Sequence, residues 1–335
     1  MNSYERYTFR LRGEPVDLPP NFDIMMQRAV HHIGERLGRY YLDHRVLVAA
    51  NLAVLEDFHL DILQAISDPY REAADHGLAV EFSDDGLPVS KTPLLAEPED
   101  LRKLQPVAPT AGRRMSDRLA AIRLFRERAG GQAPILGWVE GALAEAADLR
   151  GVSQLLSDLY DRPQWVTELL EFCTEEAIAF ARAQIAAGAD IIGVGDAVGS
   201  QVSPRMYRQF ALPYEQRIFK AIRAAGAVGR LHVCGNTSRI VADMATSGAQ
   251  IVDLDWMVDW SQAVQTLAGR GVAACGNFDP VKVMLQGTSA EVRQAVLRCV
   301  AAGGATSFIN AGCEIPDGTP AENLLAQYRA LCEAH

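Results

Sequence analysis

The chain has 335 residues, of which 49% are hydrophobic and 22% are charged, and its formal net charge is −10 at pH 7. This composition is ordinary for a globular protein with a large core, and the length suits two average domains or one large α/β barrel. The acidic balance argues against a nucleic-acid partner, which would require a basic face. The first residues lack the apolar core of a signal peptide, and no apolar run approaches the roughly 18 residues of a membrane span. We therefore expect a cytoplasmic protein whose cysteines stay reduced.

The first third of the chain has the weakest pattern. Residues 1–20 are expected to form an N-terminal extension, and two uncertain strands are placed near residues 21–25 and 60–66. Residues 84–112 contain several prolines and are expected to form an insertion outside the core of the fold.

From residue 133 onward, strand-like and helix-like segments alternate. Hydrophobic runs predict strands at residues 133–139, 189–195, 229–233, 250–255, 271–275 and 306–310. Most of them follow a helical stretch that closes in Ala-Gly or Ser-Gly, where glycine takes the left-handed turn into the next strand. Such βα repeats favour parallel pairing. With the two uncertain strands the total would be eight, so we predict a single domain, residues 1–335, built as a (β/α)8 TIM barrel.

Polar residues follow several of these strands, at the end where barrel enzymes carry their active sites. They are Asp196, His232, Cys234, Asp255, Asn277 and Cys313. Side chains two apart in a strand point to the same face, so His232 and Cys234 project toward one point, and Cys313 arrives from another strand end. One His and two Cys would bind Zn²⁺ and leave a fourth position open for a substrate.

The alternative is that these cysteines only pack. A His-x-Cys pair alone is weak evidence, because buried cysteine commonly serves as a small hydrophobic residue. Cys173, Cys299 and Cys332 lie in helical patterns and are expected to be packing residues, whereas Cys275 ends a buried strand and is the one competing ligand. The cysteine spacing is unlike that of a closed structural zinc finger.

Three stretches resemble the uroporphyrinogen decarboxylase superfamily: Gly276–Pro280, which reads Gly-Asn-Phe-Asp-Pro, Leu254–Trp256, and Asn310–Asn323 near the carboxyl terminus. Within that superfamily, His232-Val-Cys234 together with Cys313 is similar to the zinc motif of the cobamide-dependent methyltransferases. The resemblance covers most of the chain from about residue 130 onward and is thinner before it. It implies a zinc-dependent transfer of a methyl group between a corrinoid and a small thiol or methylated substrate, with zinc activating the substrate heteroatom.

The decarboxylase branch of the superfamily implies a different activity. Those enzymes carry an arginine-rich loop that holds the carboxylates of the substrate. In this chain the corresponding residues, 23–32, contain a single arginine, Arg28. One guanidinium is a poor partner for a polycarboxylate. Because Asp68 matches the key aspartate of the decarboxylases, a lyase acting on a carboxylated small molecule stays an alternative. A non-catalytic protein that binds zinc or a corrinoid is a third.

Residues near the predicted metal receive candidate roles. The resemblance makes Glu140 a fourth ligand or general acid, although a rim glutamate is equally expected. Asp196 would hydrogen-bond the substrate or cap the next helix. Asp255 would orient His232 by a hydrogen bond or be a structural carboxylate.

The rim of the barrel supplies further candidates. In the Gly-Asn-Phe-Asp-Pro turn, Asn277 would touch the substrate or the corrin and Asp279 would cap the segment that follows. Trp138, Trp256 and Trp260 lie near strand ends and would wall an apolar pocket or belong to the core.

A complete cobalamin-binding motif, Asp-x-His-x-x-Gly, is missing from the sequence. Asp57-Phe-His59 begins such a run, but no glycine follows at the required place. We therefore expect the corrinoid (cobalamin) to be presented by a partner protein that docks over the barrel mouth. The other expected partner is a small-molecule methyl donor or thiol acceptor.

Overall fold

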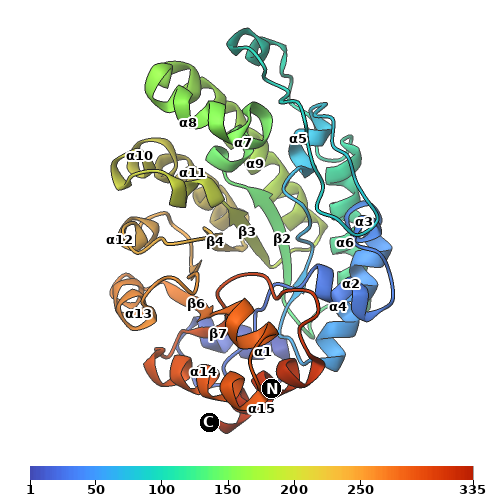
Figure 1. Ribbon diagram of the computed structural model, residues 1–335, viewed down its shortest axis with the longest axis vertical. Coiled ribbons are helices and arrows are strands. Elements are labelled where there is room, and N and C mark those ends of the chain that lie inside the picture. Colours follow the sequence, from blue (N-terminus) through green and yellow to red (C-terminus); the bar gives the residue numbers. More distant parts are fainter. Residues whose placement is uncertain (335) are drawn as a thin grey trace.

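A single parallel sheet organises the computed structural model, which describes residues 1–334. These residues form seven strands that pair in sequence order: β1 (Leu63–Gln64), β2 (Ile135–Glu140), β3 (Ile191–Gly195), β4 (Val228–His232), β5 (Ile251–Asp253), β6 (Ala273–Phe278) and β7 (Phe308–Ala311). Every neighbouring pair is parallel. Figure 1 shows the sheet curled in the middle of the molecule, with helices around its outer side.

Helices connect the strands. The structure contains the α-helices α1 (Ser3–Leu11), α2 (Gln27–His32), α3 (Leu37–Leu42), α4 (His44–Asp57), α5 (Arg71–Asp75), α6 (Arg113–Ala129), α7 (Ala142–Arg150), α8 (Val152–Asp161), α9 (Pro163–Ala187), α10 (Pro204–Phe210), α11 (Leu212–Ala224), α12 (Val241–Met244), α13 (Trp260–Ala268), α14 (Ser289–Ala302) and α15 (Ala321–Glu333), with two 3-10 helices, η1 (Pro98–Lys103) and η2 (Ala197–Gln201), and a π-helix, η3 (Pro280–Leu285). Within residues 1–334, none of these helices combines the length and apolar character that crossing a bilayer requires.

The six strands predicted from residue 133 onward are confirmed, with small shifts at their ends. The uncertain strand near residues 60–66 is reduced to the two residues of β1, and residues 21–25 are not in a strand. The eight-stranded closed barrel is therefore not confirmed. The described residues form a seven-stranded parallel sheet that curls as a barrel sheet does.

Residues 20–25 nevertheless run between the two edge strands of the sheet. The carbonyl of Pro20 accepts a hydrogen bond from the amide of Ile309 in β7 at 3.2 Å. The carbonyl of Asp23 accepts one from the side-chain amide of Gln64 in β1 at 2.7 Å. A proline has no amide hydrogen to give to a strand ladder, which helps to explain why this segment bridges the edges without becoming a strand.

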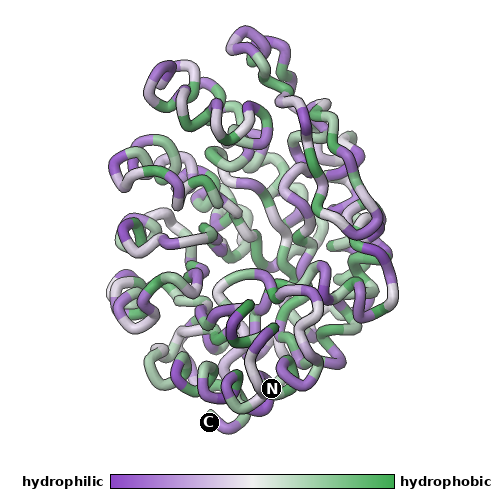
Figure 2. The backbone as a smooth tube through the Cα atoms, viewed as in Figure 1, coloured by the Kyte–Doolittle hydropathy of each residue, from purple (hydrophilic) through white to green (hydrophobic). Residues whose placement is uncertain are grey.

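Apolar side chains fill the inside of the curled sheet. The buried cluster there includes Tyr7, Phe22, Leu136, Trp138, Ile191, Ile251 and Phe308. The rings of Phe22 and Phe308 lie 4.7 Å apart between centroids, and α1 contributes Tyr7 to the same cluster. Hydrophobic residues run through the central strands, whereas the outer loops and helix faces are more hydrophilic (Figure 2). Trp138 belongs to this interior and also lines the cavity described next.

Candidate metal centre

The structure brings the three predicted ligands together at the carboxyl ends of β4 and β7. His232 ends β4, Cys234 follows two residues later, and Cys313 lies two residues beyond the end of β7. The Nε2 atom of His232 lies 3.1 Å from the Sγ of Cys234, which lies 4.0 Å from the Sγ of Cys313. All three ligand atoms lie within 4.8 Å of one another. Ligand atoms of a tetrahedral zinc site are about 3.5 to 3.8 Å apart, so this donor set and its spacing fit zinc.

Strand pairing fixes the orientation of the imidazole. His232 is in register with Asp253 at the end of β5, and its Nδ1 lies 2.8 Å from the Oδ2 of Asp253. Asp253 also accepts hydrogen bonds from the Nε of the buried Arg230 at 2.8 and 3.0 Å. A carboxylate on Nδ1 keeps the proton there, so the Nε2 lone pair faces the two sulfurs.

The electrostatics of this chain support a charged carboxylate next to the imidazole. Burial acts against ionisation of Asp253, but Arg230 and His232 lower the pKa of Asp253 to about 2. Burial also acts against a charge on His232, yet Cys234 and Asp253 raise the pKa of the imidazole above its usual range. A divalent metal would take the place of the imidazole proton on the side of the sulfurs.

Of the two roles expected for Asp255, the structure contradicts the orientation of His232, because Asp253 holds that position, and agrees with a structural carboxylate. Asp255 lies two residues beyond the end of β5, in a loop. Its carboxylate accepts hydrogen bonds from the amides of Gly235 at 2.9 Å and Met257 at 3.1 Å. Asp255 therefore fixes the loop that follows Cys234 and acts on the ligands only through the backbone.

The thiols of Cys234 and Cys313 differ in acidity because they hydrogen-bond to each other. The hydrogen bond with Cys234 lowers the pKa of Cys313 to about 4, and the same contact raises the pKa of Cys234. One thiolate is thus available before any metal binds, and metal binding would release the remaining proton. The competing candidate, Cys275, is buried elsewhere and donates to the Oδ1 of Asn310 at 2.9 Å.

A cavity of about 170 Å³ lies against the three ligands. Apolar side chains form most of its wall: Ile24, Met26, Ile66, Pro69, Trp138 and Ala197. Glycines of β3 make room for the indole of Trp138, since a Cβ on Gly193 would lie 2.2 Å from its Cε3 and a Cβ on Gly195 would lie 2.9 Å from its Cζ2. Of the three predicted pocket tryptophans, Trp138 lines this cavity, and Trp256 and Trp260 line a separate one.

Glu140 ends β2 and reaches the cavity, but its carboxylate is already engaged. Its Oε1 accepts hydrogen bonds from Arg71 at 2.7 Å and from the indole nitrogen of Trp138 at 3.2 Å. Burial raises the pKa of Glu140 to about 7, although Arg71 acts in the opposite direction. Among the described residues, Glu140 is not one of the group of potential ligands that lie within 4.8 Å of one another. Its geometry suits a proton donor or acceptor beside the metal better than a direct ligand.

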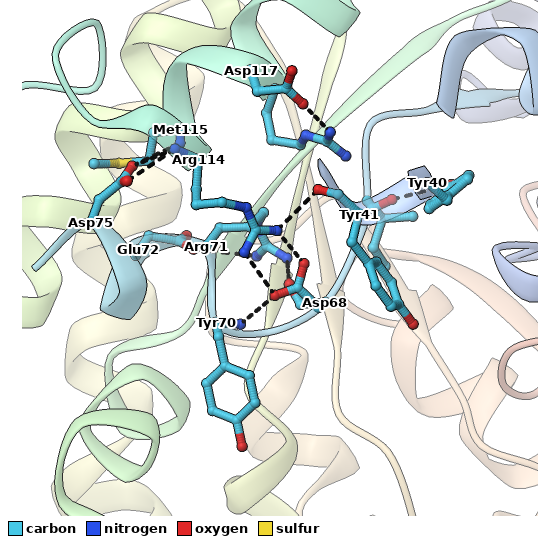
Figure 3. A network of polar contacts seen from close by, with 12 residues as sticks. Tyr40, Tyr41, Asp68, Tyr70, Arg71, Glu72, Asp75, Arg114, Met115 and Asp117 are labelled. Atoms are coloured by element: carbon cyan, nitrogen blue, oxygen red, sulfur yellow. Dashed lines mark hydrogen bonds and ion pairs between the residues drawn. The ribbon is translucent and has the colours of Figure 1, made fainter. Parts of the chain in front are cut away.

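A buried ion-pair network lies behind Glu140. Asp68 pairs with Arg114 and also accepts a hydrogen bond from the amide of Tyr70 at 3.2 Å. Figure 3 shows Asp68 beside the guanidinium groups of Arg71 and Arg114. Arg71 donates to the backbone carbonyl of Asp68. The residue that matches the key aspartate of the decarboxylases is therefore neutralised inside the protein, and it does not line the cavity.

The other predicted site residues have mainly structural contacts. Asp196 is fully buried and accepts a hydrogen bond at 3.0 Å from Ala144 in the first turn of α7, so it caps that helix and not the next one. Asn277 donates to the carbonyl of Val258 at 2.8 Å. Asp279 accepts from two amides at the start of η3, and its predicted capping role is confirmed. Neither Asp196, Asn277 nor Asp279 lines the cavity at the three ligands.

Sequence reasoning missed two carboxylates of the site. Asp253 was inside a predicted strand, and its pairing with His232 depends on the register between β4 and β5, which the sequence does not give. Glu314 follows Cys313 directly, lines the cavity, and accepts hydrogen bonds from the amides of Met26 and Gln27 at 3.3 Å. Burial raises the pKa of Glu314 to about 7.

Comparison with known proteins agrees with this fold. The model of the uroporphyrinogen decarboxylase (URO-D) family matches residues 2–333. A methylcobamide:CoM methyltransferase of Methanosarcina acetivorans is 28% identical over 96% of this chain and 94% of its own length. A uroporphyrinogen decarboxylase of Nostoc punctiforme is 28% identical over 93% of this chain and 91% of its own.

A solved structure shows the same fold along the whole chain. It is a methyltransferase from Methanosarcina mazei, with a TM-score of 0.90, 24% identity and coverage of 99% of both chains. From the match over residues 2–333 we conclude that the chain belongs to the uroporphyrinogen decarboxylase (URO-D) family.

Proposed function

We propose that this protein is a corrinoid-dependent methyltransferase that uses a zinc ion bound by His232, Cys234 and Cys313. The main support for the proposal is that one imidazole nitrogen and two sulfurs lie within 4.8 Å of one another at the carboxyl ends of β4 and β7. The methylcobamide:CoM methyltransferase that matches along nearly the whole chain supports corrinoid-dependent methyl transfer.

Three protein ligands leave one position of a tetrahedral zinc open. When bound there, zinc supplies a Lewis acid that keeps a thiol substrate deprotonated at neutral pH or polarises the heteroatom of a methyl donor. In the thiol direction, a corrinoid would supply the methyl group to the substrate sulfur, and the electron pair of the broken cobalt–carbon bond would stay on the corrinoid.

The residues of this chain position the reaction. Asp253, charged through Arg230, holds the imidazole of His232 with Nε2 toward the metal. Trp138 and its apolar neighbours give the cavity a mostly apolar wall, which would strengthen electrostatic interactions inside it once the site is closed to water. Glu140, with its pKa raised to about 7, holds or accepts a proton within the same cavity.

The decarboxylase alternative finds little support at this site. Arg28, the one arginine of the first loop, donates to the carbonyl of Thr319 at 3.0 Å and stacks over Phe58. Asp68 is paired with Arg114. A polycarboxylate would therefore meet neither the arginines nor the free aspartate that its decarboxylation requires.

The corrinoid is proposed to arrive on a partner protein, because the sequence lacks a complete motif for holding it. We also propose that residues 1–335 act as one domain and that the protein works in the cytoplasm. All six cysteines are free, as a zinc–thiolate site in a reducing compartment requires.

Metal analysis and a methyl-transfer assay test this function together. Purified protein should contain about one zinc per chain and should demethylate methylcobalamin in the presence of a thiol. His232→Ala and Cys234→Ser should lose both the metal and the transfer, whereas Cys332→Ser, which alters an exposed cysteine, should lose neither. Zinc binding without transfer to any thiol or from any methyl donor would instead support a non-catalytic metal-binding protein.

A further inference from the structure

The cavity beside the three ligands carries an unusual set of charges. Apart from the ligands, the ionisable side chains that line it are Glu140 and Glu314, and none of its lining residues is Lys or Arg. Its remaining polar side chain is that of Ser67, whose buried hydroxyl has no hydrogen-bond partner among the described residues. Acidic or neutral groups therefore form the whole polar surface of the cavity.

Arg71 and the backbone amides of Met26 and Gln27 already donate to glutamate side chains. Arg71 is fully buried behind Glu140, to which it donates, and it also pairs with Glu72 at 3.4 Å. The backbone amides at the start of α2 would attract an anion, but Glu314 accepts from both of them. The Nε of Arg71 has no hydrogen-bond partner among the described residues, but Arg71 does not line the cavity, so a ligand inside the cavity contacts no cationic side chain.

The metal cannot supply the missing positive charge. Zn²⁺ with two thiolate ligands has a formal net charge of zero, and a substrate thiolate would make the centre negative. A second negative charge on the same substrate would then lie next to two carboxyl groups without a cationic partner. If the non-reacting end of the substrate is neutral, it would contact the apolar wall. If that end is cationic, it would also contact the indole of Trp138 and the carboxyl groups of Glu140 and Glu314.

The volume of the cavity also limits the size of the substrate. At about 170 Å³ it is smaller than the roughly 300 to 1,000 Å³ of ordinary ligand pockets, so it suits a compound of few heavy atoms.

From these contacts we propose that the substrate of this site is a small compound whose non-reacting end is neutral or positively charged, and that the cavity excludes anionic thiols and anionic methyl donors. The inference rests on the proposed zinc-dependent methyl transfer and defines the substrate class of that same site.

Three thiols with the same two-carbon chain test the inference. They are 2-aminoethanethiol, 2-mercaptoethanol and 2-mercaptoethanesulfonate, whose ends are cationic, neutral and anionic. Each is titrated into protein loaded with Co²⁺ in place of zinc, and the thiolate-to-cobalt absorption band reports binding without any methyl transfer. We expect the sulfonate to bind on the order of 100-fold more weakly than 2-mercaptoethanol, as for a buried like-charge contact. Equal or tighter binding of the sulfonate, or no thiol-dependent band at all, would overturn the inference.

Met26 offers a way to reverse the preference. It lines the cavity and is partly buried, so Met26→Arg would add a cation to the wall. Met26→Arg should narrow or invert the preference against the sulfonate, whereas the matched uncharged variant Met26→Gln should keep the parent's order. An identical shift in both variants would contradict the role of charge. If Met26→Arg does not fold, the three titrations of the parent protein still decide the question.

A separate assay keeps the two proposals distinguishable. Demethylation of methylcobalamin measures the proposed function, and cobalt absorption measures the charge preference. Thiols that bind in the expected order but accept no methyl group would contradict the proposed function and support the preference.

Discussion

The metal centre and the ion-pair network at Asp68 both bury charged side chains near strand ends, but different forces hold them. At the metal centre, His232 and Asp253 lie opposite each other on paired strands, so the backbone ladder sets their distance. In the network, Asp68 comes from a loop, whereas Arg71 begins α5 and Arg114 lies in the first turn of α6. No ladder joins these elements, and their side chains hold one another through charge. Removing a charge should therefore impair metal binding at the first region and folding at the second.

The largest effect on stability is expected from Arg114→Met. The variant leaves the carboxylate of Asp68 buried without its partner, which should lower the free energy of unfolding by about 3–5 kcal/mol. Urea denaturation measures this change, and the zinc content per folded chain should stay at the parent's value. The double variant Asp68→Leu/Arg114→Met removes both charges and should recover most of the loss. If the double variant is as unstable as the single one, packing and not charge holds this region.

Unlike Asp253 and Asp68, the buried carboxyl group of Asp196 has no ion-pair partner among the described residues. Burial raises the pKa of Asp196 to about 7, whereas the unfolded chain ionises this group near pH 4. The folded state therefore binds the proton more tightly. The stabilising effect of that proton is complete below about pH 4 and is lost as the pH rises to about 7, by up to about 4 kcal/mol. Asp196→Asn cannot ionise, so its stability should fall less than the parent's over this interval.

Chemical unfolding at a series of pH values measures this difference. Glu140 and Glu314 have pKa values raised to about 7 as well, but both are present in parent and variant, so the difference between the two profiles reports Asp196 together with its interactions with Glu140 and Glu215. Parallel profiles would mean that Asp196 is ionised in the folded protein.

Asp253→Asn should weaken zinc binding by about 10- to 100-fold, as other carboxylates that orient a metal-binding histidine do. The asparagine can no longer hold the proton on Nδ1 as strongly, so the orientation of Nε2 toward the sulfurs is less fixed. Competition with a chelator measures the affinity. Asp255→Asn is the matched control, because Asp255 contacts the backbone of the same region and not His232. Equal losses in the two variants would contradict the assignment of Asp253.

These two aspartates also mark the limit of what the sequence could predict. The alternation of a strand placed His232 and Cys234 on one side, and hydrophobic runs, most of them after a helix that closes in glycine, located six of the seven strands. Which aspartate faces His232 depends on the register between β4 and β5, and a one-residue or two-residue uncertainty in a strand end is enough to exchange Asp253 for Asp255. The pairing of Asp68 with Arg114 was beyond sequence reasoning, because 45 residues separate the positions and no regular element links them.

The smallest effect on metal binding is expected where the two regions meet, at the wall formed by Trp138. A Cβ on Gly193 would lie 2.2 Å from the indole, so Gly193→Ala should push the ring toward the cavity and cost about 1–3 kcal/mol of stability by overpacking. Because the ligands themselves are untouched, zinc should be retained while the binding of small thiols weakens. Cobalt absorption titrations and thermal unfolding measure the two effects. Gly269→Ala is the control, since Gly269 has a φ of −60° and its added Cβ would meet no atom closer than 3.5 Å. Unchanged thiol binding in Gly193→Ala would show that the indole is not part of the substrate wall, and the apolar character assigned to this cavity would then depend on the aliphatic residues alone.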